Sequence, residues 1–234
     1  MPRVIAALIR HGDYQQLAET PSAHQPFPLT PEGEAQARQA ATELAQTIDT
    51  NDWTLSPEVD SSQLLRAWQT ARIISDELSG RFPIPPKLTC YNELAERGLG
   101  SAANLTLSQI EKIIREDPRF PELPADWKSN SRFRLPLQGA ESLMEAGERV
   151  AVHLREQMKH LSVHAGNDTL KLFVGHGASF RHAAHHLGIL SFEQIAKLSM
   201  FHAKPVFLEY LPGGEWRHIA GEWKVRGRQS EYTD

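Results

Sequence analysis

The chain has 234 residues, of which 40% are hydrophobic and 23% are charged, the balance of an ordinary globular protein with room for one large α/β domain. The formal net charge of −4 gives no overall basic bias toward nucleic acid or membrane, so an anionic substrate would need a local basic pocket. The single cysteine excludes an internal disulfide, and the absence of a secretion signal or a long apolar run leads us to expect a cytoplasmic protein.

The first predicted element is a strand that ends in a candidate site. Six apolar residues, Val4 to Ile9, run directly into Arg10, His11 and Gly12. A short apolar run before a turn signal is typical of a strand buried on both faces. Ligands of open α/β sheets bind at the carboxyl ends of the strands. We therefore expect a reactive histidine beside a fixed positive charge, although a loop histidine with a satisfied hydrogen bond is the simpler alternative.

Helix and strand signals alternate between residues 30 and 94. Thr30 is expected to cap the first helix, and Ser61 or Ser62 is expected to cap the second. Pro31 suits the first helical position, whereas Pro57 weakens the strand between the two helices. The expected elements are a helix over 31–48, a weak strand over 53–59, a helix that Gly80 ends, and a strand over 87–94.

The irregular part of the chain is residues 97–140. One helix is expected over 106–116, and the rest is rich in turn residues. An insertion of this length in a compact domain is usually functional or disordered. We interpret it as a flap over the site that carries Lys128, Arg132 and Arg134 as candidate substrate contacts. A surface loop without substrate contact is an equally good interpretation.

The last third of the chain repeats the pattern of the first strand. A predicted strand over 169–174 ends in Gly175-His176-Gly177, between expected helices over 140–161 and 178–187. If the two strands are neighbours in a parallel sheet, both imidazoles project from the same edge, where the following helix points its free N–H groups. Together with Arg10 and Arg66, the two imidazoles would form a pocket for a dianion.

A short helix over 191–198 and a hairpin around Pro212-Gly213-Gly214 complete the expected elements. Together they predict one α/β domain over residues 1–234, a three-layer sandwich. Its central sheet is mostly parallel, helices cover both faces, and the flap is inserted over about 97–140.

Five segments in order carry a family resemblance. They are Arg10-His11-Gly12, the stretch Pro28 to Gly33, Ser61-Ser62, the stretch Arg66 to Ala71, and Gly175-His176-Gly177. Each segment is weak evidence alone, but the ordered set is specific and covers most of the chain. The sequence resembles the histidine phosphatase superfamily, the phosphoglycerate-mutase-like proteins.

The resemblance implies roles for these residues. His11 would be the nucleophile that takes the phosphoryl group, and His176 would join it in catalysis. Arg10, Arg66 and Gly177 would bind the phosphate. A carboxylic acid would protonate the leaving oxygen. The local Glu-Arg-x-x-Gly pattern favours Glu96 for this role, with Glu93 as the competitor. No metal and no cofactor is implied, because arginines and imidazoles supply the positive charge.

The reaction itself has more than one interpretation. The family's mutases usually carry a longer segment with tyrosine and lysine after the acid, whereas this chain has the small, uncharged stretch Ser101 to Thr106. This favours a phosphomonoesterase acting on a small phosphorylated metabolite. A cofactor-dependent phosphoglycerate mutase is the alternative, and a non-catalytic phospho-ligand-binding module is the second. The oligomeric state is open.

Further histidines are candidates for binding roles. His24, in the loop after the nucleophile, is a candidate substrate contact. His182, His185 and His186 share a helix face, which would suit a metal ion. Because no cysteine or clear carboxylate partner lies near them in the sequence, we expect no metal site.

Overall fold

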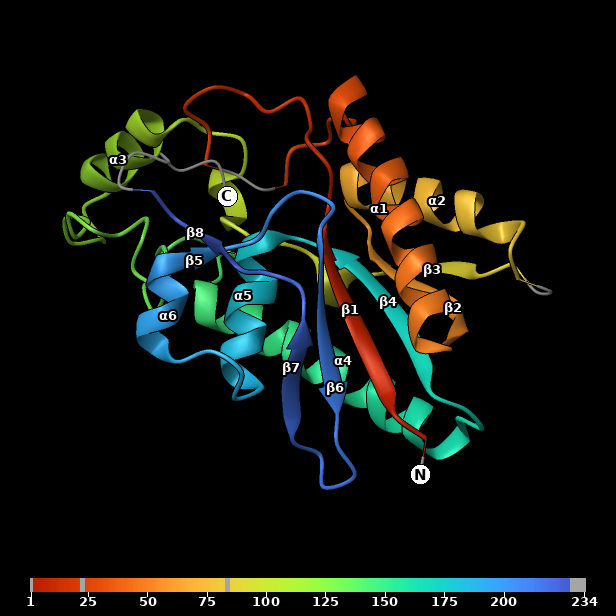
Figure 1. Cartoon of the computed structure of the whole chain (residues 1–234). Helices are drawn as coiled ribbons and strands as arrows, with labels where there is room; N and C mark the ends of the chain where they lie inside the picture. Colours follow the sequence, from red (N-terminus) through yellow and green to blue (C-terminus); the bar gives the residue numbers. More distant parts are fainter. Residues whose placement is uncertain (1, 22–23, 83–84, 228–234) are drawn as a thin grey trace.

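The computed structural model describes residues 2–21, 24–82 and 85–227, and these contain a six-stranded sheet between two layers of helices (Figure 1). Four neighbouring strands are parallel, and the next two strands are each joined to their inner neighbour by an antiparallel pairing. The strand order is β3 (Lys87–Tyr91), β2 (Thr54–Ser62), β4 (Thr169–Gly175), β1 (Val4–Arg10), β6 (Pro205–Tyr210) and β7 (Trp216–Ala220). The predicted α/β class with a mostly parallel sheet is confirmed.

Strand β1 lies inside the sheet and contributes to the core on both faces. Alternate side chains of a strand point to opposite sides. Ile5, Ala7 and Ile9 therefore pack against α1 (Pro31–Asn51) and α2 (Leu65–Ser79). Val4, Ala6 and Leu8 pack against α4 (Leu143–His164) and α5 (Gly177–His186). This double burial is why the strand reads as an unbroken apolar run.

The predicted cap of the first helix is confirmed, that of the second is wrong, and the fourth helix has a cap that the sequence analysis did not predict. Thr30 caps α1 by accepting a hydrogen bond from the Gly33 N–H at 3.1 Å. Ser142 caps α4 in the same way. The cap residue of α2 is Leu64, which has no capping side chain. The prediction of a Ser61 or Ser62 cap was wrong, because β2 continues through both serines in register with β3.

The flap has its own small core. It contains the short helices η2 (Gly100–Ala102) and α3 (Leu107–Glu116). Leu99, Ala102, Ile110, Trp127 and Leu135 are buried together. Of the small residues that follow the candidate acid, Ala102 therefore packs inside the flap. In Figure 1 the flap lies to one side of the sheet's carboxyl edge, and the Leu107 N–H donates to Glu19 in the loop that follows β1.

The remaining short elements are η1 (Asn92–Leu94), α6 (Phe192–Lys197), β5 (Leu198–Ser199) and β8 (Lys224–Val225). The predicted strand over 87–94 thus ends at Tyr91 and continues as η1. None of the helices in the described ranges is both long and apolar enough to cross a membrane.

Candidate active site

The two strands that end in histidine are neighbours. β1 and β4 run parallel, with Arg10 paired to Gly175 in the register. The His11 N–H donates to the Gly175 carbonyl at 3.0 Å. The two imidazole centroids, of His11 and His176, are 5.1 Å apart. The sheet therefore brings both histidines to one edge, as the sequence predicted.

Hydrogen bonds fix which nitrogen of His11 carries its proton. Nδ1 lies 2.7 Å from the Gly12 carbonyl, which only accepts, so Nδ1 must donate. Nε2 accepts from Nε of Arg66 at 3.2 Å. Burial first, and then the positive charges around it, of which Arg66 is the strongest, hold the pKa of His11 well below its ordinary value. His11 is therefore neutral near pH 7, with its lone pair on Nε2.

The second histidine has the complementary arrangement. Arg66 Nη2 donates to Nδ1 of His176 at 3.2 Å, so Nε2 carries the proton and donates to Ser62 Oγ at 2.9 Å. Burial first and then Arg66 keep the pKa of His176 well below its ordinary value. The sequence did not predict this role for Ser62. Its position at the end of a strand adjacent to β4 is the signal that could have revealed it.

Arg66 is the centre of the site. Its side chain is buried, and it spans both imidazoles while donating through Nη1 to the Gln25 carbonyl at 3.2 Å. Its guanidinium carbon lies 4.3 Å from the centroid of the Tyr14 ring, a contact that the sequence did not predict. The planar guanidinium of Arg66 is thus held between the imidazole rings of His11 and His176.

Arg10 and Gly177 meet at the start of α5. Arg10 is buried and donates through Nη1 to the Met200 carbonyl at 3.0 Å. A Cβ atom at Gly177 would lie 3.1 Å from Cδ of Arg10. Glycine at this position therefore leaves room for the arginine to pass the first turn of the helix.

Glu96 lies at the same edge of the sheet as the two histidines. Its buried carboxylate accepts from the N–H groups of Arg97 and Ala178, each at 2.9 Å. The second of these belongs to the first turn of α5, two residues after His176. Glu93, in contrast, is exposed. His24 lies over the backbone of Glu96, where its Nε2 donates to the Glu96 carbonyl at 3.0 Å.

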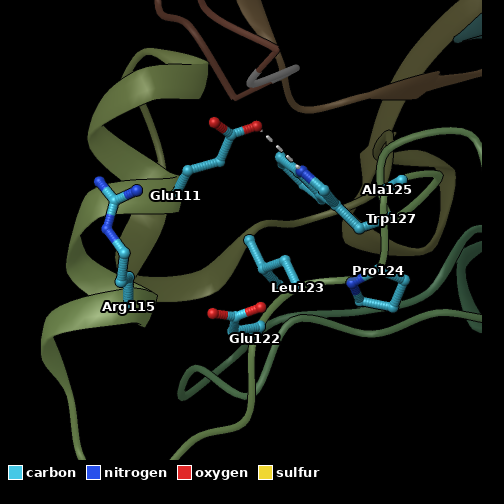
Figure 2. Close-up of a pocket in the computed structure, with 7 residues that line it drawn as sticks. All are labelled: Glu111, Arg115, Glu122, Leu123, Pro124, Ala125 and Trp127. Atoms are coloured by element: carbon cyan, nitrogen blue, oxygen red, sulfur yellow. Dashed lines mark hydrogen bonds between the residues drawn. The ribbon is translucent and has the colours of Figure 1, made fainter.

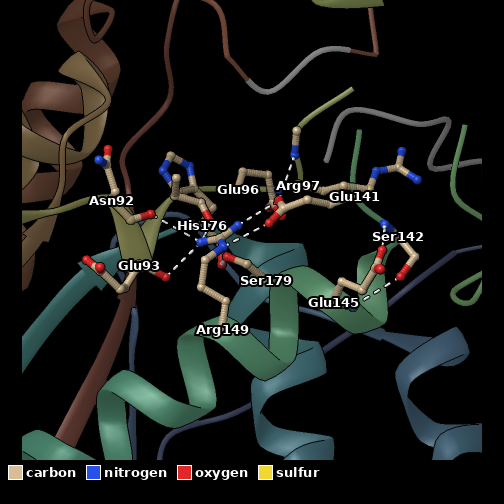
Figure 3. Close-up of polar contacts among 12 residues, drawn as sticks. Asn92, Glu93, Glu96, Arg97, Glu141, Ser142, Glu145, Arg149, His176 and Ser179 are labelled. Carbon is tan, nitrogen blue, oxygen red and sulfur yellow. Dashed lines mark hydrogen bonds and ion pairs between the residues drawn. The ribbon is translucent and has the colours of Figure 1, made fainter. Parts of the chain in front are cut away.

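Arg149 of α4 holds the segment that carries Glu96 (Figure 3). It donates to the carbonyls of Asn92, Glu93 and Ala95 at 3.2, 2.8 and 3.1 Å. It also forms two bonds to the Glu141 carboxylate, at 2.9 and 2.8 Å, and Glu141 accepts from the Gly98 N–H at 3.1 Å. The backbone is thus fixed on both sides of the acid, by a residue that the sequence did not single out.

A third histidine faces His11. The rings of His202 and His11 are 5.5 Å apart, edge to face. Burial, followed by the charge of Arg10, lowers the pKa of His202 to about 4. The Ala203 N–H donates to the Arg10 carbonyl at 2.8 Å. Because β6 runs antiparallel to β1, the residues just before β6 lie at the carboxyl end of β1. No pattern in the sequence predicted that pairing.

The three flap cations separate in the structure. Lys128 lines a cavity together with Arg97 and Ala178. The guanidinium carbon of Arg132 lies 4.5 Å from the centroid of the Phe192 ring, and Arg134 pairs with Glu145 at 3.1 Å. Both of these arginines are exposed, and neither lines that cavity. Of the three, only Lys128 therefore lines the same cavity as Arg97, the residue that follows the candidate acid.

A different cavity lies within the flap itself, with a volume of about 260 Å³ (Figure 2). Glu111 and Arg115 of α3 face Leu123 and Trp127 across it, and the Trp127 indole donates to Glu111 at 3.5 Å. None of the histidines or arginines of the sheet edge lines this cavity.

The histidines of α5 bond to separate carbonyl groups. His182 donates to Ala178 at 2.7 Å. His185 donates to Leu190 at 2.9 Å, and His186 donates to Met144 at 3.0 Å. Within the described residues, no three side chains of histidine, cysteine, aspartate or glutamate converge as a metal ligand set would. His185 and His186 thus fasten α5 to its surroundings, whereas the bond of His182 lies within the helix.

Solved structures with the same fold include both phosphatases and a mutase. A mycobacterial glucosyl-3-phosphoglycerate phosphatase in complex with VO3 is 20% identical, with a TM-score of 0.63, and the match covers 97% of this chain and 100% of that chain. A phosphoglycerate mutase from Bacillus anthracis str. Sterne is 17% identical, with a TM-score of 0.68 and coverage of 94% and 92%. A phosphoserine phosphatase from Entamoeba histolytica, in complex with 3-phosphoglyceric acid, is 17% identical, with a TM-score of 0.61 and coverage of 96% and 98%.

The sequence comparisons give the family. A search of curated proteins found no match. The family model described as histidine phosphatase superfamily (branch 1) matches residues 6–226, nearly the whole chain. This match confirms the resemblance carried by the ordered motifs around His11, Arg66 and His176. The chain therefore belongs to the histidine phosphatase superfamily, branch 1.

Proposed function

We propose that this protein is a phosphomonoesterase that transfers the phosphoryl group of a small phosphate ester to Nε2 of His11 and then to water. In the first step the Nε2 lone pair attacks phosphorus, the bond from phosphorus to the ester oxygen breaks, and Glu96 as a carboxylic acid gives that oxygen its proton. In the second step water attacks phosphorus, its proton goes to the Glu96 carboxylate, and the bond from phosphorus to nitrogen breaks. Inorganic phosphate leaves, and His11 is regenerated.

The charges of the site suit this reaction. Phosphoryl transfer asks a protein chiefly to position the group and to stabilise charge on its oxygens. Arg10 and Arg66 would supply planar donors, and the free N–H groups at the start of α5 would add partial positive charge. His176 would donate through a proton that now goes to Ser62 Oγ.

One observation carries the proposal, namely that His11 is neutral and holds its one ring proton on Nδ1. A nucleophilic imidazole needs a lone pair directed into the site and a pKa low enough to keep it unprotonated. The Gly12 carbonyl holds the proton on Nδ1, while Arg66 marks the lone pair on Nε2. The same bonds place the lone pair of His11 beside Arg66 and His176, where the phosphoryl group would be held.

The test is hydrolysis of p-nitrophenyl phosphate in the presence of EDTA. We expect turnover by the wild type and by His164→Ala, which changes an exposed histidine of α4, and none by His11→Ala. With a phosphate-labelled ester, an acid-labile and alkali-stable label on His11 after a rapid quench would identify the phosphohistidine intermediate. Full hydrolysis by His11→Ala would refute the proposal, and tight vanadate binding without turnover of any ester would favour the binding module.

A phosphoglycerate mutase remains the second candidate, because cationic side chains line the cavity beside Glu96 and could retain a second phosphate. Interconversion of 2- and 3-phosphoglycerate that is faster than their hydrolysis would establish the mutase. Hydrolysis without interconversion would exclude it.

A further inference from the structure

The place of the candidate proton donor depends on its backbone. Two backbone N–H groups, those of Arg97 and Ala178, hold the carboxylate of Glu96, each at 2.9 Å. A general acid must lie within about 2.6–3.2 Å of the atom that it protonates. The course of the chain on both sides of Glu96 therefore decides whether its carboxyl group reaches the leaving oxygen.

The backbone before Glu96 is held by one arginine of α4. Nη1 of Arg149 donates to the carbonyls of Asn92, Glu93 and Ala95 at 3.2, 2.8 and 3.1 Å. The last of these carbonyls belongs to the residue that directly precedes Glu96. A guanidinium suits this cluster because it presents several N–H donors in a fixed plane.

The backbone after Glu96 is held through the same arginine. Nε and Nη2 of Arg149 bond to the two oxygens of the Glu141 carboxylate at 2.9 and 2.8 Å. Glu141 accepts from the Gly98 N–H at 3.1 Å, and its own N–H donates to the Gly98 carbonyl at 2.8 Å. In Figure 3 the Arg149 side chain lies between Glu93 and Glu141. One side chain therefore spans both flanks of the candidate acid.

Glu141 directly follows the flap, at the base where the two ends of the flap meet. Leu99 and Ala140 form an antiparallel bridge at this base. The side chains of Arg149 and Glu141 are only 25% and 27% exposed, and their two parallel bonds define a single geometry. The ion pair therefore joins α4, the flap base and the segment of Glu96 into one unit.

We propose that Arg149, acting through Glu141 and the backbone of residues 92–98, is a positioning residue for Glu96. This proposal rests on the proposed function, and it adds a residue that acts on the proton donor without taking part in bond breaking. The contacts of His11 come from β4 and α2, so His11 should stay in place when Arg149 is lost. The loss should therefore slow the transfers that need a proton on the leaving oxygen and spare those that do not.

The experiment measures kcat/KM for a series of substituted phenyl phosphates, from phenyl phosphate to p-nitrophenyl phosphate. These esters have similar shapes, but nitrophenolate leaves without full protonation, whereas phenolate depends more on the acid. Since a displacement of 1 Å can cost about 10²-fold, we expect Arg149→Gln to lose about 10–10²-fold on phenyl phosphate and less than about threefold on p-nitrophenyl phosphate. Arg155→Gln is the matched control, because Arg155 is an exposed arginine of the same helix that donates to the His186 carbonyl.

Glu141→Gln tests the same unit from its other side, and it carries the test if Arg149→Gln does not fold. We expect the same selective loss, and no further loss in the double variant, because the two residues act on Glu96 together. On protein with wild-type circular dichroism, an equal loss on every ester, unchanged values, or losses that add in the double variant would overturn the proposal. The proposed function would stand in each of these cases, since it is tested separately by the dependence of hydrolysis on His11.

Discussion

At the scale of single residues, the site depends on one arginine that donates to two histidines. The guanidinium of Arg66 reaches His11 and His176 through different nitrogens, each at 3.2 Å. Both rings must be neutral to accept these bonds, so the fixed positive charge belongs to the arginines. A lysine offers a point charge in place of a planar fork, and it could not bridge the two rings in this way.

The structure makes a sharp distinction between the two glutamates that compete as proton donor. We expect Glu96→Gln to lower kcat on an alkyl phosphate by about 10²–10⁴-fold, the usual value of general acid catalysis. The loss on p-nitrophenyl phosphate should be smaller, because nitrophenolate leaves without full protonation. The steady-state kinetics of Glu93→Gln, an exposed neighbour, provide the control. A greater loss in Glu93→Gln than in Glu96→Gln would reverse the assignment.

Two adjacent serines allow a similarly matched test. Ser62 Oγ accepts from His176, whereas Ser61 Oγ donates to a backbone carbonyl of β2 at 2.9 Å. Loss of one hydrogen bond of about 1 kcal/mol should lower kcat about fivefold in Ser62→Ala. Ser61→Ala should keep its kcat and lose only stability. Equal kcat values for the two variants, measured on protein with wild-type circular dichroism, would argue against a positioning role for Ser62.

At the scale of elements, the loop after β1 and the start of α1 touch through their backbones. A Cβ atom at Gly33 would lie 1.9 Å from the Asp13 carbonyl oxygen, and one at Gly12 would lie 2.4 Å from that of Gly33. The turn that carries His11 is therefore pressed against the first turn of α1. Glycine is required at both positions by this close approach.

Gly33→Ala should force that contact apart. We expect a loss of about 1–3 kcal/mol in the free energy of unfolding, the usual cost of overpacking, together with reduced activity because His11 moves with the turn. Thermal denaturation and p-nitrophenyl phosphate turnover would show both effects. Gly80→Ala is the control, since no atom lies within 4 Å of the added Cβ there. A normal melting temperature in Gly33→Ala would show that the turn yields freely.

The elements were predictable where burial was strongest. β1 and β4 are apolar throughout because both faces are covered, and each ends only one residue beyond its predicted end, at Arg10 and Gly175. β2 was less clear. Pro57 interrupts its pattern, and the strand absorbs the interruption through a register shift between Leu55 and Val59 before it continues to Ser62. No local signal in the sequence shows that the strand continues through Ser61 and Ser62, and for this reason the prediction of a serine cap was wrong.

At the scale of the whole molecule, the sequence predicted the residues at the ends of neighbouring parallel strands but not those brought in from elsewhere. His11 and His176 could be paired because apolar strands and parallel topology bring their ends together. His202 reaches the site through an antiparallel return, and Arg149 through a helix face. Their placement depends on long-range packing, which single-sequence patterns do not contain. The same reason explains why the flap cations were not told apart.

The whole fold also buries several neutral histidines, and this has a consequence for stability. His182 and His202 have pKa values lowered to about 3 and about 4, and burial and arginine charge hold those of His11 and His176 well below their ordinary values. Below pH ~6.5 the unfolded chain takes up protons that the folded protein refuses. The stability is thus complete above pH ~6.5 and is lost as the pH falls toward the folded pKa values.

Urea unfolding at pH 7.5, 6.0 and 5.0 should therefore show a falling free energy of unfolding. The slope should be about 1.4 kcal/mol per pH unit for each histidine that is protonated only on unfolding. Carboxylates contribute little in this range, because their unfolded pKa values lie near 4. His182→Gln should flatten the slope by one histidine, whereas His164→Gln, which changes an exposed residue, should keep it. A stability that does not change between pH 7.5 and 5.0 would mean that the folded protein takes up these protons too, and the neutral histidine pair around Arg66 would then be wrong.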